Sequence, residues 1–304
     1  MGYSSWKTED WSTYSTATAS RSTKEIFSSR SLADELNPKG VIRESRDSDA
    51  NPNSTAVIVG CDVTGSMGII AEHLIRTGIG TFFEELLKRK PVTDPHMMIM
   101  GIGDCFYDTT PFQASQFEAD LTIAKWLEKV FIEQGGGGNK FENYDMAYYF
   151  AYNHTSIDCF EKRGKKGYLF TIGDEQAPEK TVGRFVESIF GDSMWQDVPF
   201  KQVIEQAMTM YHCYHIMIAE GNYARNHPEA VKTSWRNLLG QNAIWLTDYT
   251  KLSETIVSLI EFNEGESKEA IVNSWSGDTS LVIKEALKDS KTQLKTNNKG
   301  VVVL

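Results

Sequence analysis

The chain has 304 residues, with 41 acidic and 31 basic side chains and a formal net charge of −10. This length suits one large α/β domain or two small ones. The acidic balance argues against a general nucleic-acid or anionic-membrane surface, because such surfaces depend on basic side chains. No segment approaches the ~20 apolar residues that span a bilayer, and the chain begins without an apolar signal core. We therefore expect a cytoplasmic protein.

Residues 1–54 are expected to form an N-terminal arm. This stretch is rich in Ser and Thr, carries Trp6, Trp11 and Tyr14, and has a short helical pattern at 24–36. Aromatic residues at this density can anchor an arm, because leaving them in water is costly. We expect the arm to pack on the flank of the central domain or on a neighbouring subunit.

From residue 56 onwards, apolar strand segments alternate with helical segments. Strands are predicted at 56–61, 97–102, 168–172, 211–219 and 243–246. Helices are predicted at 69–89, 117–132, 142–153, 179–190, 200–210, 228–239 and 252–262. This order predicts an α/β fold over residues 55–263, with a doubly wound, mainly parallel sheet and helices on both faces. Residues 264–304 are expected to be an appendage with one helix at 281–288 and an apolar end.

The four cysteines, Cys61, Cys105, Cys159 and Cys213, are widely spaced and form no C-x-x-C pair. Free cysteine behaves as a small apolar residue and is often buried. The spacing therefore favours buried free thiols over disulfides or a zinc site. Free thiols suit a reducing compartment.

The most informative stretch follows the first predicted strand and contains Asp62, Thr64 and Ser66. A carboxylate and two hydroxyls at alternate positions of a glycine-containing turn direct three hard oxygens at one point, and Mg²⁺ prefers such ligands. The simpler alternative is that Asp and Ser cap the next helix. A nucleophile elbow would need G-x-S-x-G, which the sequence does not contain.

Three other strand ends or loops carry polar residues that could complete this site. Asp174 and Glu175 follow the strand at 168–172, although Asp174 could simply cap a helix. Asn139 and Glu142 follow a run of four glycines, which permits close backbone approach. Whether Asn139 binds metal directly, through water, or only shapes the loop is open. A phosphate-binding loop is the competing interpretation, but G-x-x-x-x-G-K-[ST] is absent. Asp104 could line the rim or be a plain turn carboxylate.

The spacing D-x-T-x-S resembles the metal-ion-dependent adhesion site (MIDAS) of von Willebrand factor type A (vWA) domains, usually D-x-S-x-S, with Thr64 in place of a serine. The segment 170–175 resembles the one whose carboxylate closes that site. The segment 137–142 resembles the G-G-G-D-x-x-E version of several intracellular vWA proteins, with Asn139 at the Asp position. The runs 43–49 and 162–168 also resemble segments of uncharacterised bacterial and phage vWA proteins.

The resemblance implies a site for Mg²⁺ or Mn²⁺ formed by Asp62, Thr64, Ser66, Asn139 and Asp174. It also implies a partner-binding rim formed by Asp104, Glu142 and Glu175. In this family the metal keeps one coordination position open, and an Asp or Glu of a partner protein fills it. The leading hypothesis is therefore an intracellular, non-enzymatic protein-interaction module, such as an adaptor for a MoxR-type AAA+ ATPase.

Two hypotheses from other classes stand beside it. One is a structural component of a phage or of a large bacterial assembly, in which the metal is only structural. The other is a Mg²⁺-dependent hydrolase. The hydrolase lacks a plausible general base and nucleophile, although Asp104, Glu142 and Glu175 are candidate acids or bases.

Overall fold

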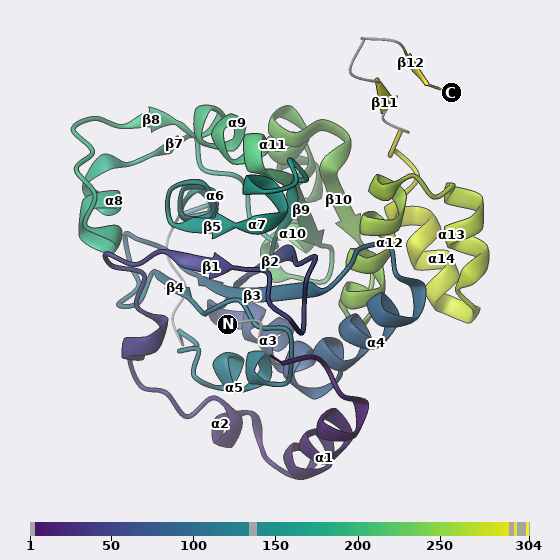
Figure 1. Ribbon diagram of the computed structural model, residues 1–304. Helices are drawn as coiled ribbons and strands as arrows, with labels where there is room; N and C mark the ends of the chain where they lie inside the picture. Colours follow the sequence, from purple (N-terminus) through teal and green to yellow (C-terminus); the bar gives the residue numbers. More distant parts are fainter. Residues whose placement is uncertain (1–3, 134–138, 292–294, 297–301, 304) are drawn as a thin grey trace.

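The computed structural model describes residues 4–133, 139–291, 295–296 and 302–303 (Figure 1). Its central sheet contains β2 (Thr55–Asp62), β3 (Pro95–Ile102), β4 (Phe112–Ala114), β6 (Gly167–Gly173), β9 (Tyr211–Ile218) and β10 (Ala243–Leu246). The strands lie in the order β10-β9-β6-β2-β3-β4, with β4 antiparallel to β3 and all other neighbours parallel. This is the order of a doubly wound sheet. The predicted fold class is confirmed.

Helices cover both faces of the sheet (Figure 1). One face packs against α3 (Gly68–His73), α4 (Ile79–Arg89), α5 (Thr122–Glu128) and α12 (Leu252–Glu264). The other face packs against α6 (Tyr144–Asn153), α8 (Gly183–Phe190), α9 (Phe200–Met210) and α11 (Pro228–Leu239). Successive side chains of a strand point to opposite faces, so Val57 and Ile58 belong to different cores. Strand β2 is apolar along most of its length, because helices cover both faces of the sheet.

Several elements differ from the prediction. The helix predicted at 69–89 is interrupted by a π-helical turn (Leu74–Gly78), and the one predicted at 24–36 is only α2 (Thr23–Ile26) and a 3-10 turn (Asp34–Leu36). Of the helix predicted at 117–132, only α5 forms. In the helix predicted at 179–190, the first residues instead form β7 (Lys180–Thr181), which pairs with β8 (Val198–Pro199). The appendage contains α13 (Lys268–Ser274) and α14 (Gly277–Ala286). Unpredicted elements include α1 (Thr8–Ala19), β1 (Arg43–Ser45), β4, β5 (Thr155–Ile157) and α7 (Asp158–Glu161).

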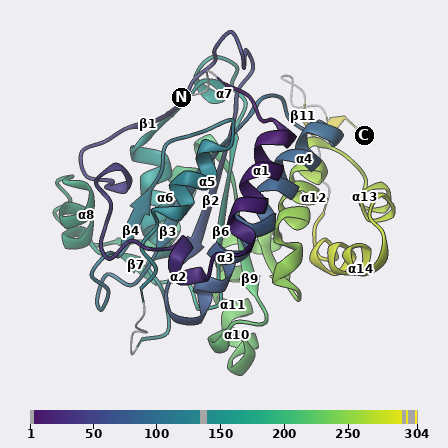
Figure 2. The ribbon, with the colours of Figure 1, turned by 90° about the horizontal axis from the view of Figure 1, so that it is seen from below.

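The N-terminal arm packs on the α4 side of the molecule, and α1 lies beside α4 (Figure 2). The ring of Trp6 stacks on Phe83 with a centroid distance of 4.5 Å. The indole of Trp11 lies against Gly80, where an added Cβ would be 2.1 Å from the indole nitrogen. Both tryptophans are 8% exposed. The expected packing of the arm on the central domain is confirmed at these contacts.

The later part of the arm crosses to the sheet edge formed by β4. Strand β1 pairs in parallel with β5. The guanidinium of Arg43 is buried and its Nη2 donates hydrogen bonds to the carbonyl oxygens of Glu35 at 2.7 Å and Ala114 at 3.0 Å. Ala114 belongs to β4, which has no further strand of the central sheet beyond it. Arg43 therefore satisfies one backbone carbonyl group of the edge strand β4.

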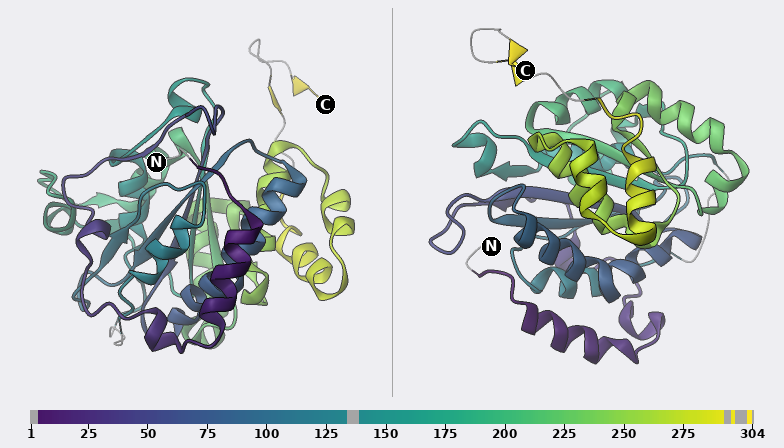
Figure 3. Two further views of the ribbon diagram at one scale, coloured as in Figure 1. Left: turned by 60° about the horizontal axis from the view of Figure 1, so that its bottom comes forward. Right: turned by 90° about the vertical axis from the view of Figure 1, so that its right-hand side faces the viewer.

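At the other edge of the sheet, α13 and α14 pack near α12 and β10 (Figure 3). The indole nitrogen of Trp275 donates to the Ser258 hydroxyl at 2.9 Å, and the guanidinium of Arg89 lies 3.7 Å from the centre of the Trp275 ring. The side chains of the apolar end 301–304 lie outside the described residues. In the described part of the chain, no helix is long and apolar enough to cross a membrane. All four cysteines are free, as predicted; Cys61, Cys159 and Cys213 are buried, whereas Cys105 is partly exposed.

Candidate metal site

The predicted metal-binding turn lies at the carboxyl end of β2. Asp62 is the last residue of the strand and is 1% exposed. Its Oδ1 accepts hydrogen bonds from the backbone nitrogen of Thr64 at 2.8 Å and from the Thr64 hydroxyl at 2.7 Å. Gly65 has a φ of 42°, which favours glycine, and opens a 3-10 turn (Gly65–Met67). The side chain of Ser66 lies outside the described residues.

A third oxygen reaches this turn from the loop before α6. The Thr64 hydroxyl is 3.1 Å from Oε1 of Glu142. Neighbouring oxygens in an octahedral Mg²⁺ shell are about 3 Å apart, because each lies about 2.1 Å from the ion. The Asp62–Thr64 and Thr64–Glu142 oxygen pairs therefore have the spacing of neighbouring ligands of a small, hard cation.

The carboxylates of this site lie in a desolvated, negatively charged environment. Burial, with the nearby charges of Asp62 and Glu175, raises the pKa of Glu142 to about 10. Burial also raises the pKa of Asp62 well above its usual range, although the hydrogen bonds from Thr64 oppose this. Burial, together with the charge of Asp174, raises the pKa of Glu175 to about 7. A bound cation would stabilise the ionised forms of these groups.

Tyr144 contacts the second carboxylate oxygen of Asp62, with the phenol oxygen 3.4 Å from Oδ2. Its ring packs edge-on against His215 and Trp235, at centroid distances of 5.0 and 5.3 Å. An added Cβ at Gly173 would lie 1.9 Å from the Tyr144 oxygen. The sequence analysis missed Tyr144, because its contact depends on this close approach between α6 and β6.

Asp174 lies one residue past β6 and is buried, but it makes no hydrogen bond with Asp62 in the described structure. Its Oδ2 accepts from the backbone nitrogen of Tyr223 at 2.8 Å, near the start of α10 (Asn222–Asn226). An added Cβ at Gly221 would lie 2.2 Å from the Asp174 Cβ, so this approach requires glycine. Burial raises the pKa of Asp174, and the charge of Asp174 acts on Asp62. The capping interaction weighed from the sequence is present, but with α10.

Asn139 and Asp104 contact each other. Nδ2 of Asn139 donates to Oδ2 of Asp104 at 2.6 Å, and Oδ1 of Asp104 accepts from the backbone nitrogen of Phe106 at 2.8 Å. Asp104 is fully buried, and this burial raises its pKa. Asn139 makes no hydrogen bond to Asp62 or Thr64 among the described contacts. The structure thus brings together two groups: Asp62, Thr64 and Glu142, and beside them Asn139 and Asp104.

Hydroxyl groups are needed for any metal site here. Among the residues that the structure describes, no three Asp, Glu, His or Cys side chains are placed so that they could hold a metal ion. The set formed by Asp62, Thr64 and Glu142 contains only two carboxylates, so it depends on Thr64. Hard oxygen donors of this mixed kind suit Mg²⁺ or Mn²⁺.

An exposed aromatic surface borders the Asn139–Asp104 group. The Phe106 ring lies 4.8 Å from Phe185 and 6.3 Å from Phe141, which directly precedes Glu142. Phe106 also lines a groove of about 550 Å³ with Arg184 and Trp195. Trp195 is 96% exposed. We call this surface, with its members Phe106, Arg184 and Trp195, the aromatic groove.

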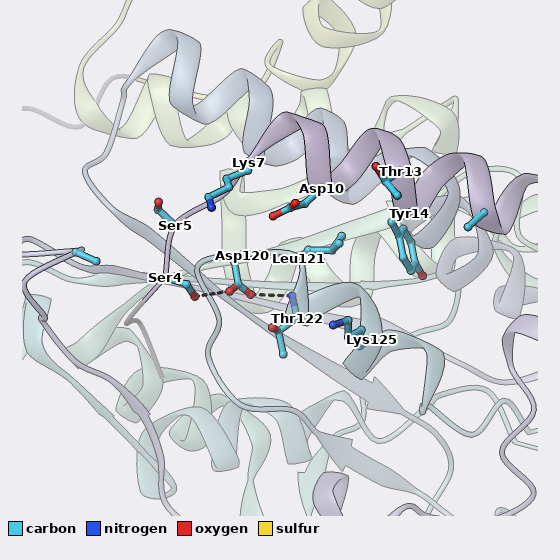
Figure 4. A pocket seen from close by; sticks show the side chains of 12 residues that line it. Ser4, Ser5, Lys7, Asp10, Thr13, Tyr14, Asp120, Leu121, Thr122 and Lys125 are labelled. Atoms are coloured by element: carbon cyan, nitrogen blue, oxygen red, sulfur yellow. Dashed lines mark hydrogen bonds between the residues drawn. The ribbon is translucent and has the colours of Figure 1, made fainter.

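A larger cleft lies away from these residues. It has a volume of about 770 Å³ and runs between α1 and the segment 120–122 (Figure 4). The hydroxyl of Ser4 hydrogen-bonds to Asp120 at one side of it. Ala50, which precedes β2, also lines the cleft, so the cleft lies towards the amino end of β2 and not at Asp62. Its position separates it from the candidate metal site.

Comparisons with known proteins give no family assignment. No protein-family model matches the sequence, and no curated protein has a significantly similar sequence. Among solved structures, the pilus adhesin SpaC from Lactobacillus rhamnosus GG in its open conformation aligns with a TM-score of 0.45 and 8% identity, over 74% of this chain and 31% of SpaC. A von Willebrand factor type A protein from Catenulispora acidiphila aligns with a TM-score of 0.36 and 9% identity, over 78% of this chain and 52% of that one. This chain thus spans 31% of SpaC and about half of the other chain.

Proposed function

We propose that this chain is a vWA-type protein-interaction module that binds a partner through a divalent cation. The observation that carries the proposal is the row of oxygens from Asp62, Thr64 and Glu142, with separations of 2.7 and 3.1 Å at the carboxyl end of β2. Ligands of doubly wound sheets collect at this end of the strands. The D-x-T-x-S spacing adds the Ser66 hydroxyl to the proposed set.

In this proposal Mg²⁺ or Mn²⁺ is held by Asp62, Thr64 and Ser66, with Asp174 nearby. The cation supplies a positive charge that attracts an Asp or Glu of the partner. Mg²⁺ usually keeps several waters, and a partner carboxylate can replace one of them. The aromatic groove offers apolar contact area beside this charge, as protein interfaces often do. The proposed role is binding without catalysis.

We further propose that the module acts in the cytoplasm, for instance as an adaptor for a MoxR-type AAA+ ATPase. Four free cysteines and the acidic composition support an intracellular role. The competing proposal is a structural subunit of a phage or of a large bacterial assembly. The two differ in one property, because only the adaptor needs the cation to hold its partner.

Calorimetric titration with Mg²⁺ tests the site. The full chain is expected to bind one ion, and Asp62→Ala should weaken binding by about a hundredfold or more, because it removes a charged ligand. Asp49→Ala is the matched control, since Asp49 is exposed and precedes the amino end of β2, whereas Asp62 lies at its carboxyl end. Equal affinity of Asp62→Ala and the unmodified chain would disprove the proposed site.

Pull-downs in Mg²⁺ and in EDTA test the partner role. The main partner should be lost in EDTA and with Ser66→Ala. Retention of every partner under both conditions would favour the structural-assembly role instead. A hydrolase screen with and without Mg²⁺ tests the assumption that the site does not catalyse.

A further inference from the structure

We infer that Glu142 is a direct ligand of the cation and that Asn139 is not; this inference rests on the metal-dependent function proposed above. The sequence resemblance implies Asn139 in the metal set and Glu142 on the rim, and it leaves open whether Asn139 binds the metal directly. The structure places them differently. Glu142 is 3% exposed and touches the Thr64 hydroxyl, whereas Asn139 hydrogen-bonds to Asp104.

The second carboxylate oxygen of Glu142 also supports direct ligation. Oε2 is buried and has no hydrogen-bond partner among the described residues. The strongest charges that act on Glu142 are all negative and come from Asp62, Glu175, Asp104 and Asp108. A buried carboxylate is costly unless it is paired or bound to a metal. A cation between Asp62 and Glu142 would remove this cost, and the mixed oxygen donors suit one.

Asn139 has a different task in the structure. A carboxylate oxygen accepts hydrogen bonds, so the amide nitrogen of Asn139 is the atom that faces Oδ2 of Asp104. The other oxygen of Asp104 is held by the backbone nitrogen of Phe106. Asn139 therefore fixes the Asp104 carboxylate beside the aromatic groove, and among the described contacts it makes no hydrogen bond with the turn that carries Asp62.

Direct ligation by Glu142 changes the charge at the ion. Together, Asp62 and Glu142 supply two negative charges, which balance those of a divalent cation. The ion would then be held firmly but would attract a partner's carboxylate less strongly than an ion with one acidic ligand. Glu142 would thus set the balance between metal affinity and partner affinity at this site.

Mn²⁺ titration of the full chain, followed by electron paramagnetic resonance and by water-proton relaxation, tests the inference. Glu142→Gln keeps the shape of the side chain and removes its charge. We expect it to weaken Mn²⁺ binding by about tenfold or more. At saturating Mn²⁺, its relaxation enhancement should correspond to one additional bound water, and acetate should bind to it more tightly. Asn139→Ala should change Mn²⁺ affinity by less than about threefold.

The outcomes separate the inference from the proposed function. If the unmodified chain binds no Mn²⁺, both are wrong. If it binds Mn²⁺ and Glu142→Gln binds equally well, or Asn139→Ala loses as much affinity, only the inference is wrong. Thermal unfolding in EDTA checks the fold: Glu142→Gln should be about as stable as the unmodified chain, because a neutral amide of the same size replaces the buried carboxyl group. Should Glu142→Gln fail to fold, the same titration of Glu142→Asp decides, and unchanged affinity would disprove the inference.

Discussion

At the scale of single residues, the position of the Asp62 carboxylate depends on a glycine in another strand. Tyr144 reaches Asp62 only because Gly173 has no side chain, since a Cβ there would lie 1.9 Å from the Tyr144 oxygen. His215 and Trp235 pack against the same ring, so the ring has little room to move aside. Gly173 thus belongs to the candidate metal site although it offers no ligand.

Gly173→Ala should therefore affect both stability and metal binding. We expect the free energy of unfolding to fall by about 1–3 kcal/mol, as is usual for overpacking, and Mg²⁺ affinity to fall as Tyr144 is displaced. Urea unfolding and calorimetric titration measure the two effects. Gly60→Ala is the control, because its added Cβ would meet the flexible end of Ile102 at 3.0 Å. If Gly173→Ala leaves Mg²⁺ affinity unchanged, Tyr144 does not orient Asp62.

At the scale of elements, the sequence predicted best what local pattern determines. The strands of the parallel sheet are predictable because each is short and rich in apolar residues, and α9 and α11 because their apolar residues recur at helical spacing. The contact of Asp62 with Thr64 lies within one turn and was foreseeable. The opposite placements of Glu142 and Asn139 depend on how separate loops meet, which no local pattern contains.

Helix α1 shows why other elements were missed. Its sequence is dominated by Ser and Thr, which have modest helix propensity, so no helical pattern stands out. Tertiary contacts stabilise it instead: Trp6 stacks on Phe83, and Trp11 fills the space above Gly80. Most helical stability in proteins comes from such packing. The arm therefore contributes to the same core as α4.

Trp11→Ala tests this contribution of α1. Because Trp11 is 8% exposed, its truncation should lower the free energy of unfolding by about 3–5 kcal/mol. Trp195→Ala is a matched control: Trp195 is 96% exposed, so its loss should cost no more than about 0.5 kcal/mol. Guanidinium unfolding measures both variants. Similar stabilities of the two would mean that the arm is not part of the core.

At the scale of the whole molecule, acidic and aromatic groups lie next to each other at the carboxyl end of the sheet. Phe106 belongs to both groups: its backbone nitrogen donates a hydrogen bond to the Asp104 carboxylate, and its ring lines the aromatic groove. Exposed aromatic residues beside a charged centre are typical of interaction hot spots. The proposed partner should therefore contact the groove and the ion together.

Trp195→Ser should separate the two contributions. We expect it to weaken capture of the partner in Mg²⁺ by about tenfold, because tryptophan side chains often dominate binding energy, while Mg²⁺ affinity stays unchanged. Leu281→Ser is the control, since Leu281 is also exposed, at 66%, but lies on α14. Equal partner capture by Trp195→Ser and the unmodified chain would remove the aromatic groove from the interface.

The contact of Arg43 with Ala114 should reduce aggregation of the protein in concentrated solution. An edge strand with free backbone groups can pair with the edge of another molecule and start aggregation. Arg43 satisfies one of these groups on β4 and places a positive charge there. The arm therefore contributes to the core and also hinders the pairing of another molecule's strand with β4. Proteolysis within the arm would expose that edge, so damage at the N-terminal end would promote self-association through the sheet.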